Sequence, residues 1–104
     1  MATEKRQVSI VGSSFYPGAS EWLVRLAPGQ PLRVEREPNN PYDANAISVH
    51  IFSQKLGHFP RGFAVEVAPL MDAGHKLAAT KSRDPRFAGT GVMVVEWEKP
   101  DVAS

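Results

Sequence analysis

The sequence predicts a mainly β fold, in which about six short antiparallel strands form a small barrel with one helical segment near residues 60–74. Apolar and polar residues alternate along several short segments, which is the pattern of half-buried strands. Turn residues are frequent, since the chain contains 9 prolines and 8 glycines. A single stretch changes to helical spacing. Short strands with one intervening helix favour an OB-like barrel over a sandwich.

The strands are predicted from this alternation in chain order. QVSIV is the first, and the loop GSSFYPG, bracketed by glycines, follows it. A second strand, 21–26, is expected to end at the turn APGQ. The clearest alternation lies on either side of the hinge PNNPYDAN, and a hairpin across Ser53–Gln54 is expected after it. The predicted strands are 7–11, 21–26, 32–36, 47–52, 55–59, 75–81 and 91–97.

The helical segment is predicted after Pro60, in PRGFAVEVAPLMDAG. Pro60 suits the first helical turn, and Gly74 suits the C-terminal end. Pro69 falls inside this stretch, and we expect it to kink or split the helix. Four apolar residues recur at i, i+4, i+7 and i+8 and share one helical face: Phe63, Val67, Leu70 and Met71.

The bulk properties are those of one soluble globular domain. We expect the whole chain, 1–104, to form it, with a core over about 7–97 and frayed ends at 1–5 and 100–104. Hydrophobic residues make up 42% of the sequence and charged residues 22%, and no long apolar run predicts a membrane span. The N-terminal MATEKRQVSI has no apolar signal core, and cysteine is absent, so we expect a cytoplasmic protein.

The charge balance argues against coating of nucleic acid by charge alone. The net charge is +1 and the pI is about 8.1, whereas such proteins are strongly basic. Any role in nucleic-acid binding must therefore depend on a local patch. Two candidate patches are Lys55–His58–Arg61 and Lys76–Lys81–Arg83–Arg86.

No pattern in the sequence supports catalysis, a cofactor or a metal. A GxxxxGK[ST] phosphate loop is absent, which excludes that class of NTPase. His50 and His58 could meet across a hairpin near Asp43, as in a two-histidine, one-carboxylate metal site. Their spacing is not a metal signature, and we interpret them as surface polar residues. We therefore expect a non-enzymatic protein without a cofactor.

Tyr42 and Asp43, at the tip of the hinge, have two interpretations. The structural one is that Asp43 accepts backbone N–H bonds in an Asx turn while Tyr42 covers the core. Binding of single-stranded nucleic acid is the other, because bases stack on exposed rings while cations contact phosphates. Further predicted loops carry similar residues: Phe15 and Tyr16 in GSSFYPG, His58 and Arg61 in GHFPR, and Arg86 and Phe87 in RDPRFAG.

These segments together resemble the HIRAN domain family. Three motifs carry the resemblance in order and at family-like spacing: REP-N-PYD-x-NAI, LGH-x-P-R and PLMDAG. The resemblance covers nearly the whole chain, from about Gln7 to Trp97. Such domains occur at the N-termini of some SNF2-type remodelling and fork-reversal helicases and as small stand-alone proteins, the kind that this chain resembles. The resemblance implies a modified OB barrel.

The resemblance also implies a ligand. In helicase-linked members the domain holds the 3′ end of single-stranded DNA, so this DNA is the expected partner, with a helicase or another repair protein as a further one. By the same resemblance, Tyr42 stacks on a terminal base and Asp43 meets the terminal sugar hydroxyl. Phe15 corresponds to a second stacking aromatic.

The remaining implied contacts involve phosphate and the rim of the pocket. By resemblance, His58 and Arg61 approach phosphate, and Phe87 caps the pocket from the last long loop. Helicase-linked members have a basic residue just before the first-loop aromatic, where this chain has Ser14. The loss of one phosphate contact predicts weaker binding with a flatter salt dependence.

The leading hypothesis is a non-catalytic domain that binds single-stranded DNA at its 3′-hydroxyl end, in repair or replication-fork processing. The alternative is a protein-interaction module with Tyr42 and Phe15 as interface anchors. An enzyme or nuclease component ranks last, because no acidic cluster or metal-ligand spacing supports it. Basic residues on the same face as Tyr42 would favour nucleic acid as the partner over a protein. The candidates are Arg61, Lys81, Arg83 and Arg86.

Overall fold

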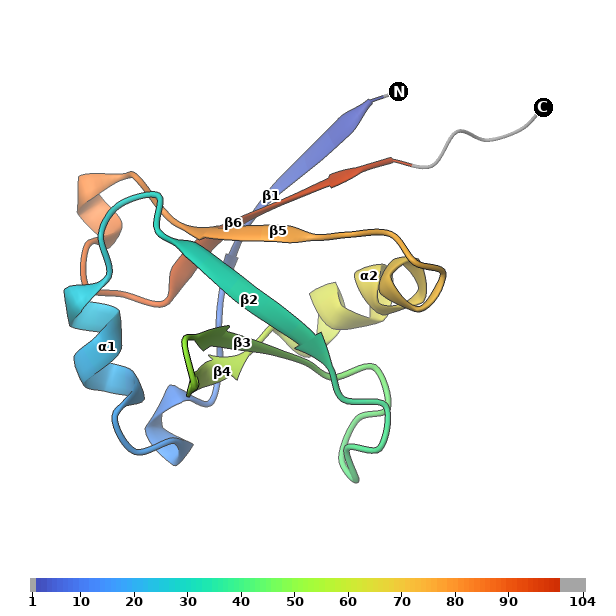
Figure 1. Cartoon of the computed structure of the whole chain (residues 1–104), viewed down its shortest axis with the longest axis horizontal. Helices are drawn as coiled ribbons and strands as arrows, with labels where there is room; N and C mark the ends of the chain where they lie inside the picture. Colours follow the sequence, from blue (N-terminus) through green and yellow to red (C-terminus); the bar gives the residue numbers. More distant parts are fainter. Residues whose placement is uncertain (1, 100–104) are drawn as a thin grey trace.

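Six strands form one antiparallel sheet in the order β1-β6-β5-β2-β3-β4 (Figure 1), as expected for a mainly β, OB-like fold. The computed structural model describes residues 2–99. The strands are β1 (Thr3–Ser9), β2 (Pro31–Arg36), β3 (Ile47–Ile51), β4 (Gln54–His58), β5 (Ala78–Lys81) and β6 (Val92–Glu98). The helices are α1 (Ala19–Arg25) and α2 (Arg61–Asp72), with the 3-10 turns η1 (Ser13–Phe15) and η2 (Pro85–Phe87).

The sheet closes into a barrel where the chain after β1 meets β4. The Val11 N–H donates to the His58 carbonyl at 2.8 Å, and the His58 N–H donates to the Val11 carbonyl at 2.9 Å. Gly57 makes this approach possible, because a Cβ at that position would lie 2.5 Å from the Val11 oxygen. The closure brings the 12–16 segment next to the end of β4.

The core lies inside the barrel, and α2 covers one end of it. The Phe63 ring packs between Phe59 and Trp97, at centroid distances of 5.0 and 5.8 Å. Val67 follows one turn later and is fully buried. Burial of each such side chain stabilises the fold by roughly 1.5–3 kcal/mol. The predicted helical stripe is therefore confirmed at these two positions, whereas Leu70 and Met71 are only partly buried.

Pro69 does not split α2, although a split was one of the two expected outcomes. The helix runs from Arg61 to Asp72 with Pro69 inside it. Pro69 is exposed, and so is Val65, whose carbonyl would accept the missing N–H bond. The lost bond therefore falls on the solvent side, where water can replace it, and the helix continues.

The predicted strand 21–26 is wrong, because this segment lies in α1. Ala19, Leu23 and Leu26 are the buried residues, at i, i+4 and i+7, which is helical spacing. The pattern extends two residues before the predicted strand and is too short to be recognised within it. Residues 2–99 thus contain two α-helices rather than one.

Three smaller expectations also need correction. Residues 3–5 are not frayed, because Thr3 pairs with Glu98 at the start of a seven-residue ladder between β1 and β6. The strand predicted at 75–81 begins only at Ala78, and the 12–18 loop contains η1. Residues 100–104, the other predicted frayed end, lie outside the described part. Within residues 2–99, no helix is long and apolar enough to cross a membrane.

Candidate functional site

An open cleft of about 620 Å³ lies between the 12–16 segment and the 38–45 loop. Both segments lie along the lower edge of Figure 1, on either side of β4. The volume is in the range of sites that hold small ligands or single nucleotides. The lining residues are Val11, Gly12, Phe15, Tyr16, Asn40, Tyr42, Asp43, Ala46, His58, Phe59 and Arg61. Six of the eight residues expected at a binding site are among them: Phe15, Tyr16, Tyr42, Asp43, His58 and Arg61.

Two aromatic rings at the cleft are exposed to solvent. Phe15 is 81% exposed and Tyr42 is 85% exposed, and they come from opposite sides of the cleft. The interpretation of Tyr42 as a lid over the core is therefore wrong. Neither ring is paired with another aromatic ring among residues 2–99, and planar ligands bind to such exposed faces by stacking.

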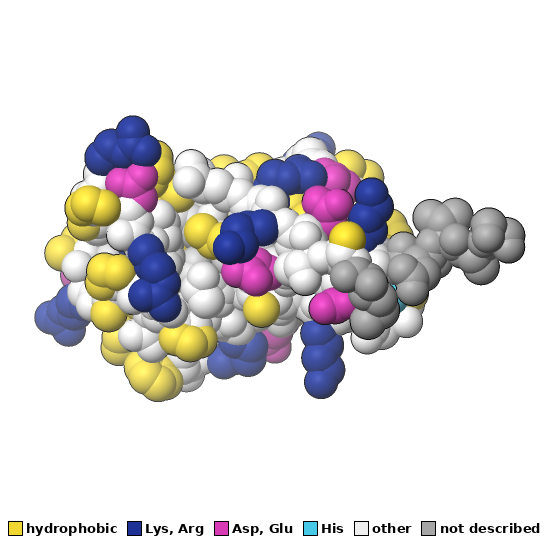
Figure 2. Space-filling model, turned by 90° about the horizontal axis from the view of Figure 1, so that it is seen from above, with side chains coloured by type: hydrophobic (Ala, Val, Ile, Leu, Met, Phe, Trp, Pro, Cys, Tyr) yellow, Lys and Arg dark blue, Asp and Glu magenta, His cyan; other side chains and the backbone are white. Residues whose placement is uncertain are grey.

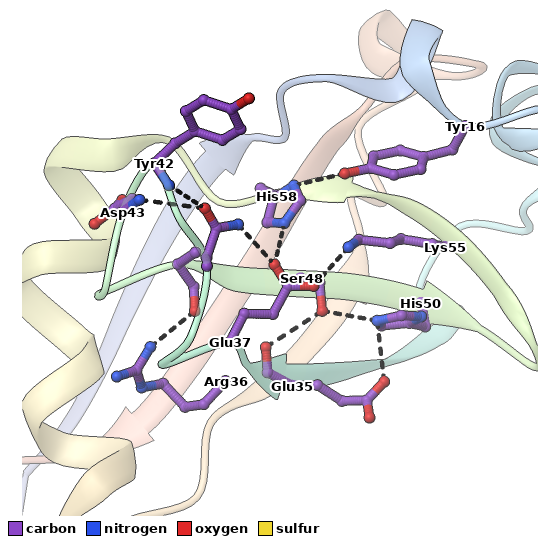
Figure 3. Close-up of polar contacts among 12 residues, drawn as sticks. Tyr16, Glu35, Arg36, Glu37, Tyr42, Asp43, Ser48, His50, Lys55 and His58 are labelled. Atoms are coloured by element: carbon purple, nitrogen blue, oxygen red, sulfur yellow. Dashed lines mark hydrogen bonds and ion pairs between the residues drawn. The ribbon is translucent and has the colours of Figure 1, made fainter.

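Hydrogen bonds within the 38–45 loop hold Tyr42 outward. The Asn40 Oδ1 accepts from the backbone N–H groups of Tyr42 at 2.9 Å and of Asp43 at 3.2 Å. Arg61, the first residue of α2, donates from Nη2 to the Tyr42 carbonyl at 2.6 Å. In Figure 3 the Tyr42 ring projects away from the bonded side chains beneath it. The loop therefore presents the ring from a fixed backbone.

Asp43 has two different carboxylate contacts. Its Oδ1 accepts the Asn45 N–H at 2.9 Å, which is the Asx turn that the sequence suggested. Its Oδ2 lies 3.6 Å from Arg61 Nε, an ion-pair distance rather than a hydrogen bond. The Asp43 side chain is mostly buried, whereas that of Arg61 is mostly exposed. One oxygen thus maintains the turn while the other faces the cationic rim of the cleft.

A carboxylate that the sequence did not single out organises the floor of the cleft. Glu37 Oε2 accepts from Lys55 Nζ at 2.5 Å, and its Oε1 accepts from Asn40 Nδ2 at 3.1 Å and lies 2.7 Å from His58 Nε2. His58 Nδ1 in turn lies 3.3 Å from the Tyr16 hydroxyl. Figure 3 shows these side chains converging beneath Tyr42. Glu37 thereby links both walls of the cleft.

The charges of this network are mutually stabilised. Burial acts to raise the pKa of Glu37, but hydrogen bonds from Lys55, His58 and Asn40 outweigh it and lower the pKa to about 2. Burial likewise acts to lower the pKa of Lys55, but the bond to Glu37 raises it overall. Lys55 also lies 4.9 Å from the Tyr16 ring centroid, within cation–π range. Glu37 and Lys55 therefore remain an ion pair at neutral pH.

His50 belongs to a separate polar group on β3. Its Nε2 lies 2.8 Å from Ser48 Oγ and 3.0 Å from Glu35 Oε2. Burial is the main cause that lowers the pKa of His50. Among residues 2–99 no group of three histidine, cysteine or acidic side chains is placed to hold a metal ion. The two histidines therefore have different carboxylate partners rather than a shared site.

The 82–90 loop does not reach the cleft. Its η2 turn lies at the upper left of Figure 1, away from the 38–45 loop. Arg86 donates to Asp84 at 2.7 Å and stacks over Phe87 at 5.6 Å. Lys81 is almost fully buried, and its Nζ donates to the backbone carbonyls of Phe87 and Val92. The structure thus separates Arg86 and Phe87 from the other expected site residues.

On the face seen from above (Figure 2), positive and negative side chains are mixed. Figure 2 shows Lys and Arg side chains scattered over this face, with Asp and Glu beside several of them. Lys5 pairs with Glu96 at 3.5 Å, and Lys99 pairs with Glu4 at 3.7 Å. Burial of Lys81 and the pairing of Arg86 with Asp84 take two of the four cations out of the second basic patch suggested by the sequence.

Comparison with known proteins agrees with this architecture. Residues 4–87 match the model of the HIRAN domain family. The chain is 36% identical over 77 residues to the helicase-like transcription factor of Mus musculus, a match that covers 73% of this chain and 7% of that protein. The human helicase-like transcription factor is 34% identical over 70 residues, or 66% of this chain and 6% of that protein. The chain thus spans only a small part of these relatives.

Solved structures share the fold. A protein from Lactobacillus plantarum has a TM-score of 0.76 at 28% identity, covering 92% of this chain and 95% of that one. The human HLTF HIRAN domain has a TM-score of 0.72 at 24% identity, covering 89% and 74%. For its DNA-bound conformation the TM-score is 0.58 at 24% identity, covering 93% and 73%. With four fifths of its residues matched to the family model, the chain belongs to the HIRAN domain family.

Proposed function

We propose that this domain binds nucleic acid in the cleft, and specifically the 3′-hydroxyl end of single-stranded DNA. The observation that carries the proposal is the pair of exposed rings, Phe15 and Tyr42, on opposite sides of one cleft that also contains Arg61. Structural kinship with an HLTF HIRAN domain described in a DNA-bound conformation supports the choice of DNA as ligand.

The aromatic residues of the cleft would stack on bases, and its arginine would contact phosphate. Tyr42 and Phe15 each offer a face to one base, worth roughly 1–3 kcal/mol per stack. Arg61 is 72% exposed at the start of α2, and its Nη1, which bonds to none of residues 2–99, can approach a phosphate. The N–H groups of Phe63 and Ala64 bond to the Pro60 carbonyl, whereas those of Arg61 and Gly62 have no partner among residues 2–99 and favour an anion at the same place.

Asp43 supports recognition of a terminus rather than of an internal nucleotide. A carboxylate repels phosphate, but it accepts a hydrogen bond from a free 3′-hydroxyl, a donor that only a chain end offers. Such a bond to a charged acceptor is worth roughly 1.5–3 kcal/mol, or about ten- to hundredfold in affinity. Oδ2 of Asp43 suits this role because the turn bond uses the other oxygen.

The proposed activity is binding of DNA without catalysis, as part of DNA repair or replication-fork processing. The cleft holds one carboxylate, one histidine and one arginine at its surface, with Glu37 engaged by Lys55 and His58. A helicase or another repair protein would supply the motor function. The domain would then deliver the 3′ end to that partner.

Fluorescence anisotropy with 5′-labelled oligonucleotides tests the proposal. We expect single-stranded DNA with a free 3′ end to bind, and blunt duplex of the same sequence to bind much more weakly, because paired terminal bases are not free to enter the cleft. A salt series should show a shallow slope, since few cations line the cleft. Equal binding to duplex and single strand would contradict the proposal.

A further inference from the structure

A second aromatic surface lies at the tip of the β3–β4 hairpin. Phe52 is 69% exposed, and its ring lies edge-on to Trp22 of α1 at a centroid distance of 5.7 Å. Phe52 also has a φ of +51°. Glycine and asparagine adopt this backbone conformation readily, whereas a bulky residue does so under strain. A strained, exposed phenylalanine held against a tryptophan contributes little to the core.

The 16–17 segment and β4 connect the cleft to this aromatic pair. Tyr16 lines the cleft, and its ring lies under Lys55 Nζ. The next residue, Pro17, accepts a hydrogen bond from Gln54 Nε2 at 2.9 Å, so this segment follows β4 toward the hairpin tip. From His58 to Gln54 the strand spans four residue steps, or about 13 Å. The Trp22–Phe52 pair lies at the far end of that path.

A cation accompanies the aromatic pair. Arg33 Nη1 donates to the Phe52 carbonyl at 2.7 Å, and the Arg33 side chain is about half exposed. Its pairing with Glu35, at 3.1 Å, is a surface ion pair that an incoming phosphate can replace at small cost. An aromatic face beside an arginine is the combination that binds an internal nucleotide of a single strand.

We infer that Phe52 and Trp22 form a second stacking subsite for the same DNA strand, upstream of the 3′ end that the cleft holds. This inference depends on the proposed function. It extends the expected contact along the DNA, since an OB-type fold covers about 4–16 nucleotides and the two rings of the cleft serve only the terminal ones. The tip of the β3–β4 hairpin then contacts the DNA strand where that strand leaves the cleft.

A length series tests the inference. Oligothymidines of about two to eight nucleotides, each with a free 3′-hydroxyl, are compared on the wild-type protein and on Phe52→Gly. Glycine suits the positive φ, so this variant removes the ring without straining the turn. We expect wild-type affinity to rise about fivefold or more once the strand reaches the hairpin tip. Phe52→Gly should lose most of that rise and keep its affinity for the shortest oligonucleotide.

Two readouts separate the possible failures. Trp22 fluorescence should be quenched by long but not by short oligonucleotides, while Trp97 is buried and should not respond. Val24→Ala is the matched control, because Val24 is 72% exposed on α1, the helix that carries Trp22. An identical length dependence in wild type and Phe52→Gly would overturn the second subsite. Absence of binding at every length would instead overturn the proposed function.

Discussion

Replacement of Glu37 by glutamine removes the carboxylate that joins Lys55, His58 and Asn40 at the floor of the cleft. The pKa of Glu37 is about 2 in the folded protein, against an ordinary value of 4.5. This difference corresponds to about 3 kcal/mol of unfolding free energy at neutral pH. The Glu37 side chain is only 24% exposed, so solvent screens the network weakly.

The sign of the pH dependence follows from the lowered pKa. The ionised carboxylate stabilises the fold, and this contribution is fully present above the ordinary pKa of 4.5. It is lost as the pH falls toward 2, where the folded-state carboxylate also takes up a proton. Glu37→Gln cannot ionise, so it should be less stable than wild type by up to about 3 kcal/mol at neutral pH, with the gap closing in acid.

Urea denaturation, followed by tryptophan fluorescence, measures the unfolding free energy of wild type and Glu37→Gln at neutral pH and near pH 2–3. Glu35→Gln is the matched control, since Glu35 is 49% exposed and forms a surface pair with Arg33 and a second contact with the less exposed His50. Glu35→Gln should lower the unfolding free energy by no more than about 1 kcal/mol. The reasoning fails if Glu37→Gln is no more destabilising than Glu35→Gln at neutral pH, or if its deficit is the same in acid.

Two further predictions concern binding. Tyr42→Ala should weaken single-strand binding about tenfold or more and leave the urea midpoint nearly unchanged, because the ring is 85% exposed; unfolding of this variant would argue instead for a structural role. Ser14→Arg places a cation on the exposed η1 turn beside Phe15, and it should tighten binding at low salt and steepen the dependence of log Kd on log salt by about 0.7. An unchanged salt slope in an anisotropy titration would show that position 14 does not face the DNA backbone.

The sequence was sufficient to predict features that depend on local patterns. Strict alternation predicted β2 and β3, and the change to helical spacing predicted α2 with its buried Phe63 and Val67. The expectation for α1 failed because its apolar positions, from Ala19 to Leu26, straddle the boundary between a loop and the predicted strand. A seven-residue helix with two buried residues, Ala19 and Leu23, gives a weak periodic signal.

Several features of the cleft could not be predicted, because they depend on contacts between distant segments. Glu37 precedes the hinge by one residue, and only the fold brings Lys55 and His58 to it. In the same way, Lys81 is indistinguishable from a surface cation until its bonds to the carbonyls of the 82–92 loop are seen. The cleft aromatics were predictable because an aromatic ring in a turn-rich loop has few core positions available to it.

Recognition of the 3′ terminus is tested most directly by competition between two oligonucleotides that differ only in a 3′-hydroxyl or a 3′-phosphate. We predict that the wild-type protein prefers the 3′-hydroxyl about tenfold or more, because Asp43 accepts that proton and repels a terminal phosphate. Asp43→Asn keeps an oxygen for the Asn45 N–H and so preserves the turn, but it removes the charge and should abolish most of this preference. Equal affinity of the wild-type protein for the two ends would contradict end recognition and leave Asp43 as a turn residue.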